Sequence, residues 1–273
     1  MNFGPLDWLH RIAQGLGLGG RARGPGGRAL RPEEVVAERH LTAAMEHLQA
    51  GRVDEALDQC HAAVRAAPTY ARAYYGRGLA YYARGDYQWT ITDQTQALRL
   101  DPSLADAYCN RAQACAAKGS YDWAVSDFTA ALQLNPQLAE AYNGRGFALT
   151  ALRRFNEALA DFDRAIQLRP DYADAYFHRG VVRGIQGDNA GAVEDYSRAI
   201  ALRPDFAQAY VNRGNTYYSM RDYRRAIADF DEAVRLNPNL AEAYNNRGLA
   251  YRELGDNTRA EADFAQAERL GFR

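Results

Sequence analysis

Lysine is almost absent from this chain of 273 residues: Lys118 is the only one, and arginine supplies the rest of the positive charge. The 33 basic and 34 acidic residues give a formal net charge of −1. A protein that binds nucleic acid would carry a concentrated basic face, so we expect no nucleic-acid partner. A GC-rich genome accounts for the preference for arginine, and we expect a bacterial protein.

Cysteine and long apolar runs are also scarce. The three cysteines, Cys60, Cys109 and Cys115, provide no disulfide framework. Cys109 and Cys115 lie six residues apart in one predicted helix, so they cannot pair without unwinding it. We expect all three to be small buried side chains in a reducing compartment, and therefore a cytoplasmic protein. No apolar run is long enough to cross a membrane.

Sequence patterns of catalytic sites are missing as well. No strand is predicted, so no glycine-rich phosphate loop follows one, and no Ser-His-Asp or Cys-His arrangement has a scaffold to place it. His40 and His47 share a helix face, but they lie two turns apart, about 10 Å along the axis, and one metal ion cannot take both. We therefore expect no enzyme activity, no cofactor and no metal.

What the sequence does contain is a repeat with a period of 34 residues. Six prolines mark it: Pro68, Pro102, Pro136, Pro170, Pro204 and Pro238. Each period also holds a tyrosine, an arginine three residues later and a small residue directly after it, and then two alanines that flank an aromatic position. A fixed period of this length indicates one supersecondary unit copied along the chain, with each copy burying its apolar face against its neighbours.

Each unit is predicted to be an antiparallel pair of helices. The tyrosine and the small residue share a face at i and i+4, and the Ala-aromatic-Ala set does so at i, i+4 and i+7. The turn between the two helices is often Gly-Asp, as in Gly85-Asp86, Gly187-Asp188 and Gly255-Asp256. Glycine suits a left-handed helix end, and aspartate can cap the next helix. The proline then ends the second helix, because the residue before it avoids the helical region.

The text AEAYNNRGLAYRELGDNTRAEADFAQAERL at 241–270 resembles the tetratricopeptide repeat (TPR). The resemblance covers nearly the whole chain and implies an all-α fold, with helix-turn-helix repeats stacked in a right-handed superhelical solenoid. We assign residues 33–273 to this domain and count seven repeats. The first repeat is degenerate, with His40 in the tyrosine column and Ala43 in the arginine column, which fits a capping role.

One departure from the usual TPR pattern is a pair of charged columns. Arginine replaces what is commonly leucine, and aspartate replaces what is commonly an aromatic residue, in the six later repeats. The columns are Arg77, Arg111, Arg145, Arg179, Arg213 and Arg247, with Asp93, Asp127, Asp161, Asp195, Asp229 and Asp263. A half-buried guanidinium can hold a carboxylate through two bonds, so we interpret the columns as structural pairs. Anion binding by these arginines is the weaker alternative, because the matched carboxylates leave little net charge.

Residues 1–32 differ in kind from the repeats. Residues 1–17 place Leu6, Leu9, Ile12 and Leu16 at helical spacing and are predicted to form a short amphipathic helix. Residues 18–32 are rich in Gly and Arg and are predicted to form a flexible linker. The segment lacks the basic start and the long apolar stretch of a signal peptide. We favour a helix that folds back on the array, or a frayed terminus, over a segment that docks on a partner or a membrane surface.

In TPR proteins the first helix of each repeat lines a concave groove, and the resemblance implies the same surface here. The expected lining carries amides, aromatic rings and one imidazole: Asn110, Asn143, Asn212, Asn215, Asn245, Asn246, His178, Tyr75, Tyr82, Phe147, Phe177 and Tyr218. Asparagine can pair with an extended peptide backbone through its donor and acceptor groups, and the rings suit apolar anchors. The simpler alternative is that asparagine is only a tolerated polar residue on a helix.

Two details refine this expectation. Similar TPR arrays bind the peptide backbone through an asparagine at the position before the arginine. In this chain Asn110, Asn212 and Asn246 occupy that position, whereas the other repeats have Gly76, Gly144 and His178 there. The TPR groove that captures C-terminal carboxylates uses lysine and arginine on this face, and the places here lack lysine, so we do not expect a carboxylate clamp.

A second surface is expected at Trp89 and Trp123, which occupy the same place in consecutive repeats. They form either an exposed apolar patch or local cation–π contacts across the Arg–Asp pairs. Our functional prediction is a non-catalytic scaffold or adaptor that binds a peptide or a protein segment in the groove. The alternatives are a self-assembling structural protein joined through Trp89, Trp123 or the termini, and, less favoured, a peripheral membrane adaptor that uses residues 6–16.

Overall fold

The computed structural model describes residues 29–272, and within them the secondary structure is entirely helical. The chain divides into two compact units, Met1–Gln137 and Leu138–Arg273. The helices of the first unit are α2 (Pro32–Gln49), α3 (Val53–Ala66), α4 (Ala71–Arg84), α5 (Tyr87–Leu100), α6 (Ala105–Ala117) and α7 (Tyr121–Leu134). Those of the second are α8 (Ala139–Ala151), α9 (Phe155–Leu168), α10 (Ala173–Ile185), α11 (Asn189–Leu202), α12 (Ala207–Ser219), α13 (Tyr223–Leu236), α14 (Ala241–Glu253) and α15 (Asn257–Arg269).

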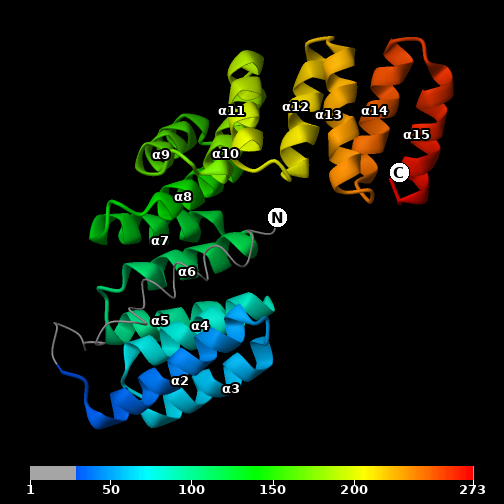
Figure 1. The fold of residues 1–273 in the computed structure, drawn as a ribbon. Helices are drawn as coiled ribbons and strands as arrows, with labels where there is room; N and C mark the ends of the chain where they lie inside the picture. Colours follow the sequence, from blue (N-terminus) through cyan, green and yellow to red (C-terminus); the bar gives the residue numbers. More distant parts are fainter. Residues whose placement is uncertain (1–28, 273) are drawn as a thin grey trace. The chain divides into compact units, whose positions relative to one another are not determined.

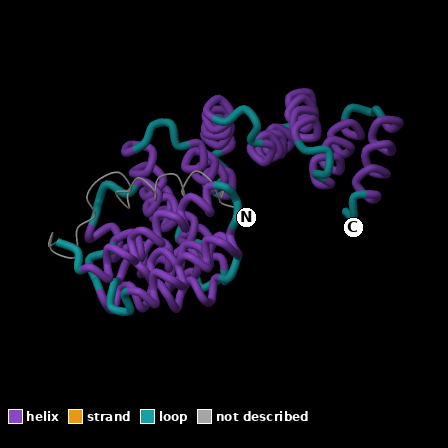
Figure 2. Tube along the Cα trace, turned by 60° about the horizontal axis from the view of Figure 1, so that its bottom comes forward, coloured by secondary structure: helices purple, strands orange, loops and turns teal. Residues whose placement is uncertain are grey.

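These helices form consecutive pairs, three in the first unit and four in the second (Figure 1). The helix predicted for residues 1–17 and most of the predicted linker lie outside the described residues. The first described helix begins at Pro32, one residue before the expected start of the solenoid. Figure 2 shows helices joined by short loops in each unit. Within residues 29–272, none of the helices combines the length and the apolar character needed to cross a bilayer.

Small residues allow the two helices of a pair to approach closely. A β-carbon on Gly146 would lie 2.7 Å from the ring of Phe162, and one on Gly214 would lie 2.7 Å from the ring of Phe230. Both phenylalanines are fully buried. The alanines that flank them in sequence are also buried, so in these two pairs the Ala-aromatic-Ala face of the second helix packs on the glycine of the first.

The turns inside the pairs use the left-handed backbone conformation at a fixed position. Glycine occupies it with positive φ at Gly51, Gly85, Gly119, Gly187 and Gly255, whereas arginine does so at Arg153 (φ 59°) and Arg221 (φ 62°). Three aspartates cap the following helix through a backbone amide: Asp188, Asp222 and Asp256. Asp86, expected to cap in the same way, makes no such bond and accepts one of 2.6 Å from Nε of Arg84, which draws its carboxylate away.

Each unit is curved, and the curvature defines an inner face. In the second unit α8 contacts α10, α10 contacts α12, and α12 contacts α14, so consecutive first helices touch one another. No such contact joins α9 with α11, α11 with α13 or α13 with α15. The same holds in the first unit, where α2, α4 and α6 touch in order. The first helices therefore lie on the shorter, concave side of each unit, which we call the first-helix face.

Candidate partner-binding surface

The arginine and aspartate columns meet in all six later repeats. In every pair Nε and Nη2 of the arginine donate to the two carboxylate oxygens, at distances from 2.6 to 2.9 Å. The aspartates are buried, and the arginine side chains are 16–22% exposed. The hydrogen bond with Asp229 is the largest contribution that raises the pKa of Arg213. Each of these guanidinium groups is therefore paired with a carboxylate inside the fold, as expected of structural pairs.

The same arginines also reach the preceding repeat, which the sequence reasoning missed. Nη1 of Arg111 donates to Thr95 (3.1 Å), that of Arg213 to Ser197 (2.9 Å) and that of Arg247 to Asp231 (2.7 Å). Each acceptor lies on a second helix, 16 residues before its arginine. In the sequence, each acceptor stands two residues after an aspartate of the column, and the polar residues at this position could have indicated the contact. Each such arginine thus ties three helices together.

In the first unit, the expected groove residues lie on α4 and α6. Tyr75 and Asn110 are buried, at 4% and 3% exposure, and Tyr82 is half-buried with its ring 5.3 Å from that of Tyr87. Burial raises the pKa of Tyr75 well above its usual value. The side-chain nitrogen of Asn110 is buried and has no partner at full hydrogen-bond geometry within the described residues, but the same side chain interacts with the hydroxyl of Tyr75 and opposes part of the rise in its pKa. Asn110 is thus packed against Tyr75 in the interior of the first unit.

In the second unit, Asn143 and His178 form a polar contact between α8 and α10. Nδ1 of His178 donates to Oδ1 of Asn143 (3.0 Å), because a carboxamide oxygen can only accept. Three rings surround the imidazole, with centroids at 5.6 Å for Phe147, 5.8 Å for Phe162 and 5.5 Å for Phe177. Burial in this environment lowers the pKa of His178 to about 4, so the ring is neutral at pH 7. The sequence placed His178 in the groove but gave no sign of this aromatic cage.

The remaining expected groove residues lie on α12 and α14. Nδ2 of Asn246 donates to Oδ1 of Asn215 (2.8 Å) across the two helices, and Nδ2 of Asn245 donates to Oδ1 of Asn246 (3.1 Å). Oδ1 of Asn212 accepts a longer bond of 3.3 Å from Gln208 on its own helix. All four asparagines are half-buried. Each bond uses only part of a carboxamide's capacity, which is two donated and two accepted bonds.

Tyr218, the last of the expected anchors, is half-buried on α12 with its ring 5.4 Å from that of Tyr223. The two tryptophans lie elsewhere in the first unit, on second helices. Trp123 is 71% exposed and Trp89 is 58% exposed, with its ring stacked on Tyr81 at 5.9 Å. In the part of the chain that the structure describes, no arginine lies over either indole.

Comparisons with known families agree with the helix pairs. Models described as tetratricopeptide repeat match residues 41–88, 105–138, 139–172, 207–240 and 230–262, and one described as TPR repeat matches 78–119 and 185–221. The chain belongs to the tetratricopeptide repeat family. The TPR fold inferred from the 34-residue period is thus confirmed. Curated proteins yield no match to this chain.

Solved TPR structures share the fold. The structure of MamA is 26% identical over 58% of this chain and 93% of its own length, with a TM-score of 0.54. A tetratricopeptide repeat protein from Parabacteroides merdae ATCC 43184 is 22% identical over 88% of this chain and 94% of its own, with a TM-score of 0.67. YrrB, described as a TPR protein with an unusual peptide-binding site, is 21% identical over 65% of this chain and 92% of its own, with a TM-score of 0.54.

Proposed function

We propose that this TPR protein is a non-catalytic scaffold that binds an extended peptide, or an extended segment of a partner protein, on its first-helix face. The asparagines at the position before the arginine, Asn110, Asn212 and Asn246, would pair with the peptide backbone. The observation that carries the proposal is the group of half-buried asparagines on α12 and α14, Asn212, Asn215 and Asn246, whose carboxamides can form more hydrogen bonds than those they make with their neighbours. Backbone N–H and C=O groups of the peptide would use this remaining capacity.

Further features support this role. The amide pairs on α12 and α14 hold Asn215 and Asn246 in place before a partner arrives, which lowers the ordering cost of binding. Tyr218 and Phe147 lie half-buried on first helices, where they suit apolar side chains of the peptide. The peptide-binding site named for YrrB belongs to a protein of the same fold. In keeping with this role we expect no cofactor and no nucleic-acid partner, and we place the protein in the bacterial cytoplasm.

The test is a peptide selected by the wild-type chain from a random displayed library. Its dissociation constant would be measured by fluorescence anisotropy for the wild type, for each single Asn→Ala variant at 110, 212 and 246, and for the triple variant. Loss of one hydrogen bond of about 1 kcal/mol predicts roughly a fivefold weakening per position. Asn257→Ala, at the exposed start of the second helix α15, is the matched control.

Circular dichroism would first show that all variants keep the same helix content. A dissociation constant of the triple variant within twofold of the wild-type value would refute the role of the asparagines. Equal weakening by Asn257→Ala would also refute it, because that residue is not on the first-helix face.

Self-assembly is the second candidate, and the exposure of Trp89 and Trp123 favours it. Two large exposed indoles one repeat apart form an apolar patch that a second copy could cover. The measurement is the molar mass by light scattering over a hundredfold range of concentration. A mass that rises with concentration in the wild type but not in Trp89→Ala/Trp123→Ala would establish this role, and a constant monomer mass would exclude it.

A further inference from the structure

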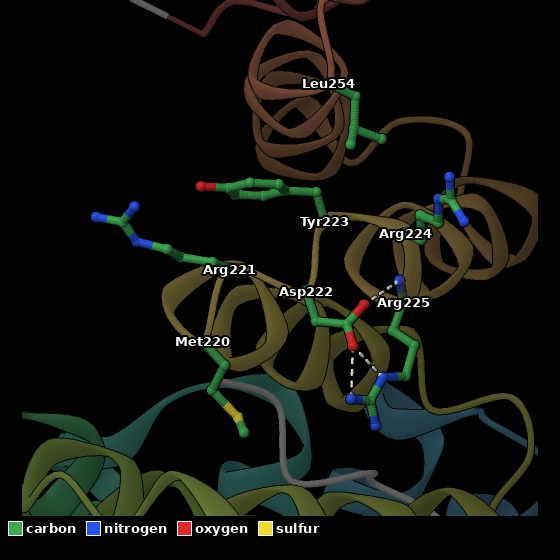
Figure 3. A pocket seen from close by; sticks show the side chains of 7 residues that line it. All are labelled: Met220, Arg221, Asp222, Tyr223, Arg224, Arg225 and Leu254. Atoms are coloured by element: carbon green, nitrogen blue, oxygen red, sulfur yellow. Dashed lines mark hydrogen bonds and ion pairs between the residues drawn. The ribbon is translucent and has the colours of Figure 1, made fainter.

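A small open pocket lies at the edge of the second unit, where the first and second helices of a repeat are joined. It has a volume of about 360 Å³ and is formed by the turn between α12 and α13 together with Leu254 at the end of α14 (Figure 3). None of the asparagines of the first-helix face lines it. The pocket combines apolar and cationic side chains.

The apolar part comes from equivalent positions of consecutive repeats. Met220 directly follows α12 and Leu254 directly follows α14, and they are 46% and 47% exposed. Single exposed apolar residues are common on protein surfaces, but these two line the same pocket, with the half-buried ring of Tyr223 also in its wall. Methionine is flexible and polarisable, so it adapts to side chains of different shape.

The charged part has two cations without a counter-ion. Asp222 is already engaged, because Nε of Arg225 donates to it at 2.5 Å and the backbone amide of Arg225 does so at 3.1 Å. These bonds lower the pKa of Asp222, so it stays ionised and paired. The side chains of Arg221 and Arg224 are exposed and form no hydrogen bond or ion pair with any described residue, although the charge of Arg224 adds to the lowering of the pKa of Asp222. In Figure 3 their side chains extend to opposite sides of the turn.

Arg221 also occupies a backbone conformation that favours glycine. Its φ is 62°, and the same turn position is glycine in five other repeats: Gly51, Gly85, Gly119, Gly187 and Gly255. A left-handed conformation costs a residue with a β-carbon roughly 1–2 kcal/mol. Arginine here therefore lowers stability compared with glycine, and its side chain makes no hydrogen bond, ion pair or cation–π contact within the described residues that would compensate. A role for that side chain outside the fold accounts for its presence.

We propose that this pocket is a second binding site, distinct from the first-helix face, for an acidic peptide segment. An apolar side chain of the segment would lie between Met220 and Leu254, and carboxylates on either side of it would pair with Arg221 and Arg224. Guanidinium groups bind carboxylates through two parallel hydrogen bonds. A phosphate backbone or an anionic bilayer would suit a broad cationic surface, whereas here two cations flank an apolar floor, which fits a peptide.

The probe is a fluorescein-labelled peptide of twelve residues in which each leucine has a glutamate on both sides, titrated with the full chain. A matched peptide carries glutamine in place of every glutamate. We expect saturable binding of the acidic peptide that weakens as salt is raised, and at least fivefold weaker binding of the glutamine peptide. Equal binding of the two peptides would overturn the proposal.

The matched variants are Arg221→Gly and Arg153→Gly. Both remove an arginine from the same left-handed turn position, so both are expected to fold and to gain stability, but only Arg221 lines the pocket. We expect Arg221→Gly and Arg224→Gln each to weaken binding of the acidic peptide at least fivefold, and Arg153→Gly to leave it within twofold. Wild-type affinity in Arg221→Gly, or equal loss in Arg153→Gly, would overturn the proposal.

Two further measurements separate this site from its alternatives. The Asn110/Asn212/Asn246→Ala variant is expected to keep full affinity for the acidic peptide. The proposal for the pocket can therefore be refuted without refuting the proposal for the first-helix face, and the reverse also holds. Binding to a single-stranded oligonucleotide and to phosphatidylserine vesicles is expected to be unaffected by Arg221→Gly. If that substitution abolished binding to either, with no effect on the peptide, the site would be a phosphate site and the proposal would be wrong.

Discussion

Arg213 on α12 and Asp229 on α13 face each other and share two hydrogen bonds, 2.8 Å from Nε and 2.7 Å from Nη2. The third nitrogen of Arg213 donates to Ser197 on α11, so one side chain joins two repeats. The ring of Tyr210 lies 5.6 Å from the same guanidinium. Arg111 and Arg247 make the same kind of hydrogen bond to the preceding repeat, so consecutive repeats are joined by polar contacts as well as by apolar packing.

Removal of one partner of this pair is expected to be strongly destabilising. Asp229→Ala leaves a guanidinium that is only 18% exposed without its carboxylate, and breaking a buried pair in this way costs about 3 kcal/mol. Urea unfolding followed by circular dichroism gives the free energy. The exposed pair Arg235–Glu232 is the control, and Glu232→Ala is expected to cost less than about 1 kcal/mol. Similar losses at both places would contradict this account of the pairs.

Glycine at the left-handed turn position is expected to stabilise the protein. Arg153→Gly and Arg221→Gly each relieve a positive φ and should raise the free energy of unfolding by about 1 kcal/mol. Differential scanning calorimetry would detect this as a higher Tm. Arg154→Gly, one residue beyond the first of these positions and without the strain, is expected to lower the Tm. A lower Tm in both turn variants would show that the arginines contribute contacts to the fold.

Two helical glycines are expected to respond to alanine in opposite directions. A β-carbon on Gly184 would meet nothing closer than 3.8 Å, so alanine should add about 0.5–1 kcal/mol by reducing the freedom of the unfolded chain. One on Gly214 would lie 2.7 Å from Phe230 and overpack the helix pair, at a cost of about 1–3 kcal/mol. Chemical unfolding of both variants tests the difference. The idea fails if Gly214→Ala is the more stable of the two.

Acidification is expected to weaken the second unit through His178. Its pKa is about 4 in the folded protein and about 6.5 in an unfolded chain, so the unfolded state takes up the proton first. The free energy of unfolding therefore falls as the pH drops from about 6.5 to about 4, and by pH 5 the loss reaches about 1–2 kcal/mol. His178→Gln keeps a donor for Asn143 but cannot titrate. The free energy of unfolding should fall less between pH 7 and pH 5 in this variant than in the wild type. An equal fall in both proteins would show that His178 is not the cause of the acid sensitivity.

Much of the fold could be predicted from the sequence because its signals are local. The 34-residue spacing of the prolines and the apolar faces at i, i+4 and i+7 depend only on neighbours within a helix or a turn. The Arg and Asp columns could be matched because their fixed offset of 16 residues joins the two helices of a single repeat. Asp86 shows the limit of such reasoning, since the Gly-Asp signal was present and the carboxylate was drawn to Arg84 instead.

The sequence by itself therefore determined the repeat, the helix pairs and the TPR family, since these follow from periodicity along one chain. Only the tertiary structure decided which side chains meet between repeats: Arg213 with Ser197, Asn246 with Asn215, and His178 with its three aromatic rings. It also decided which side chains are buried and which are exposed, as with Asn110 in the interior and Arg221 at the pocket. The physical reason is that burial and pairing depend on how successive repeats stack, and the period alone does not contain that geometry.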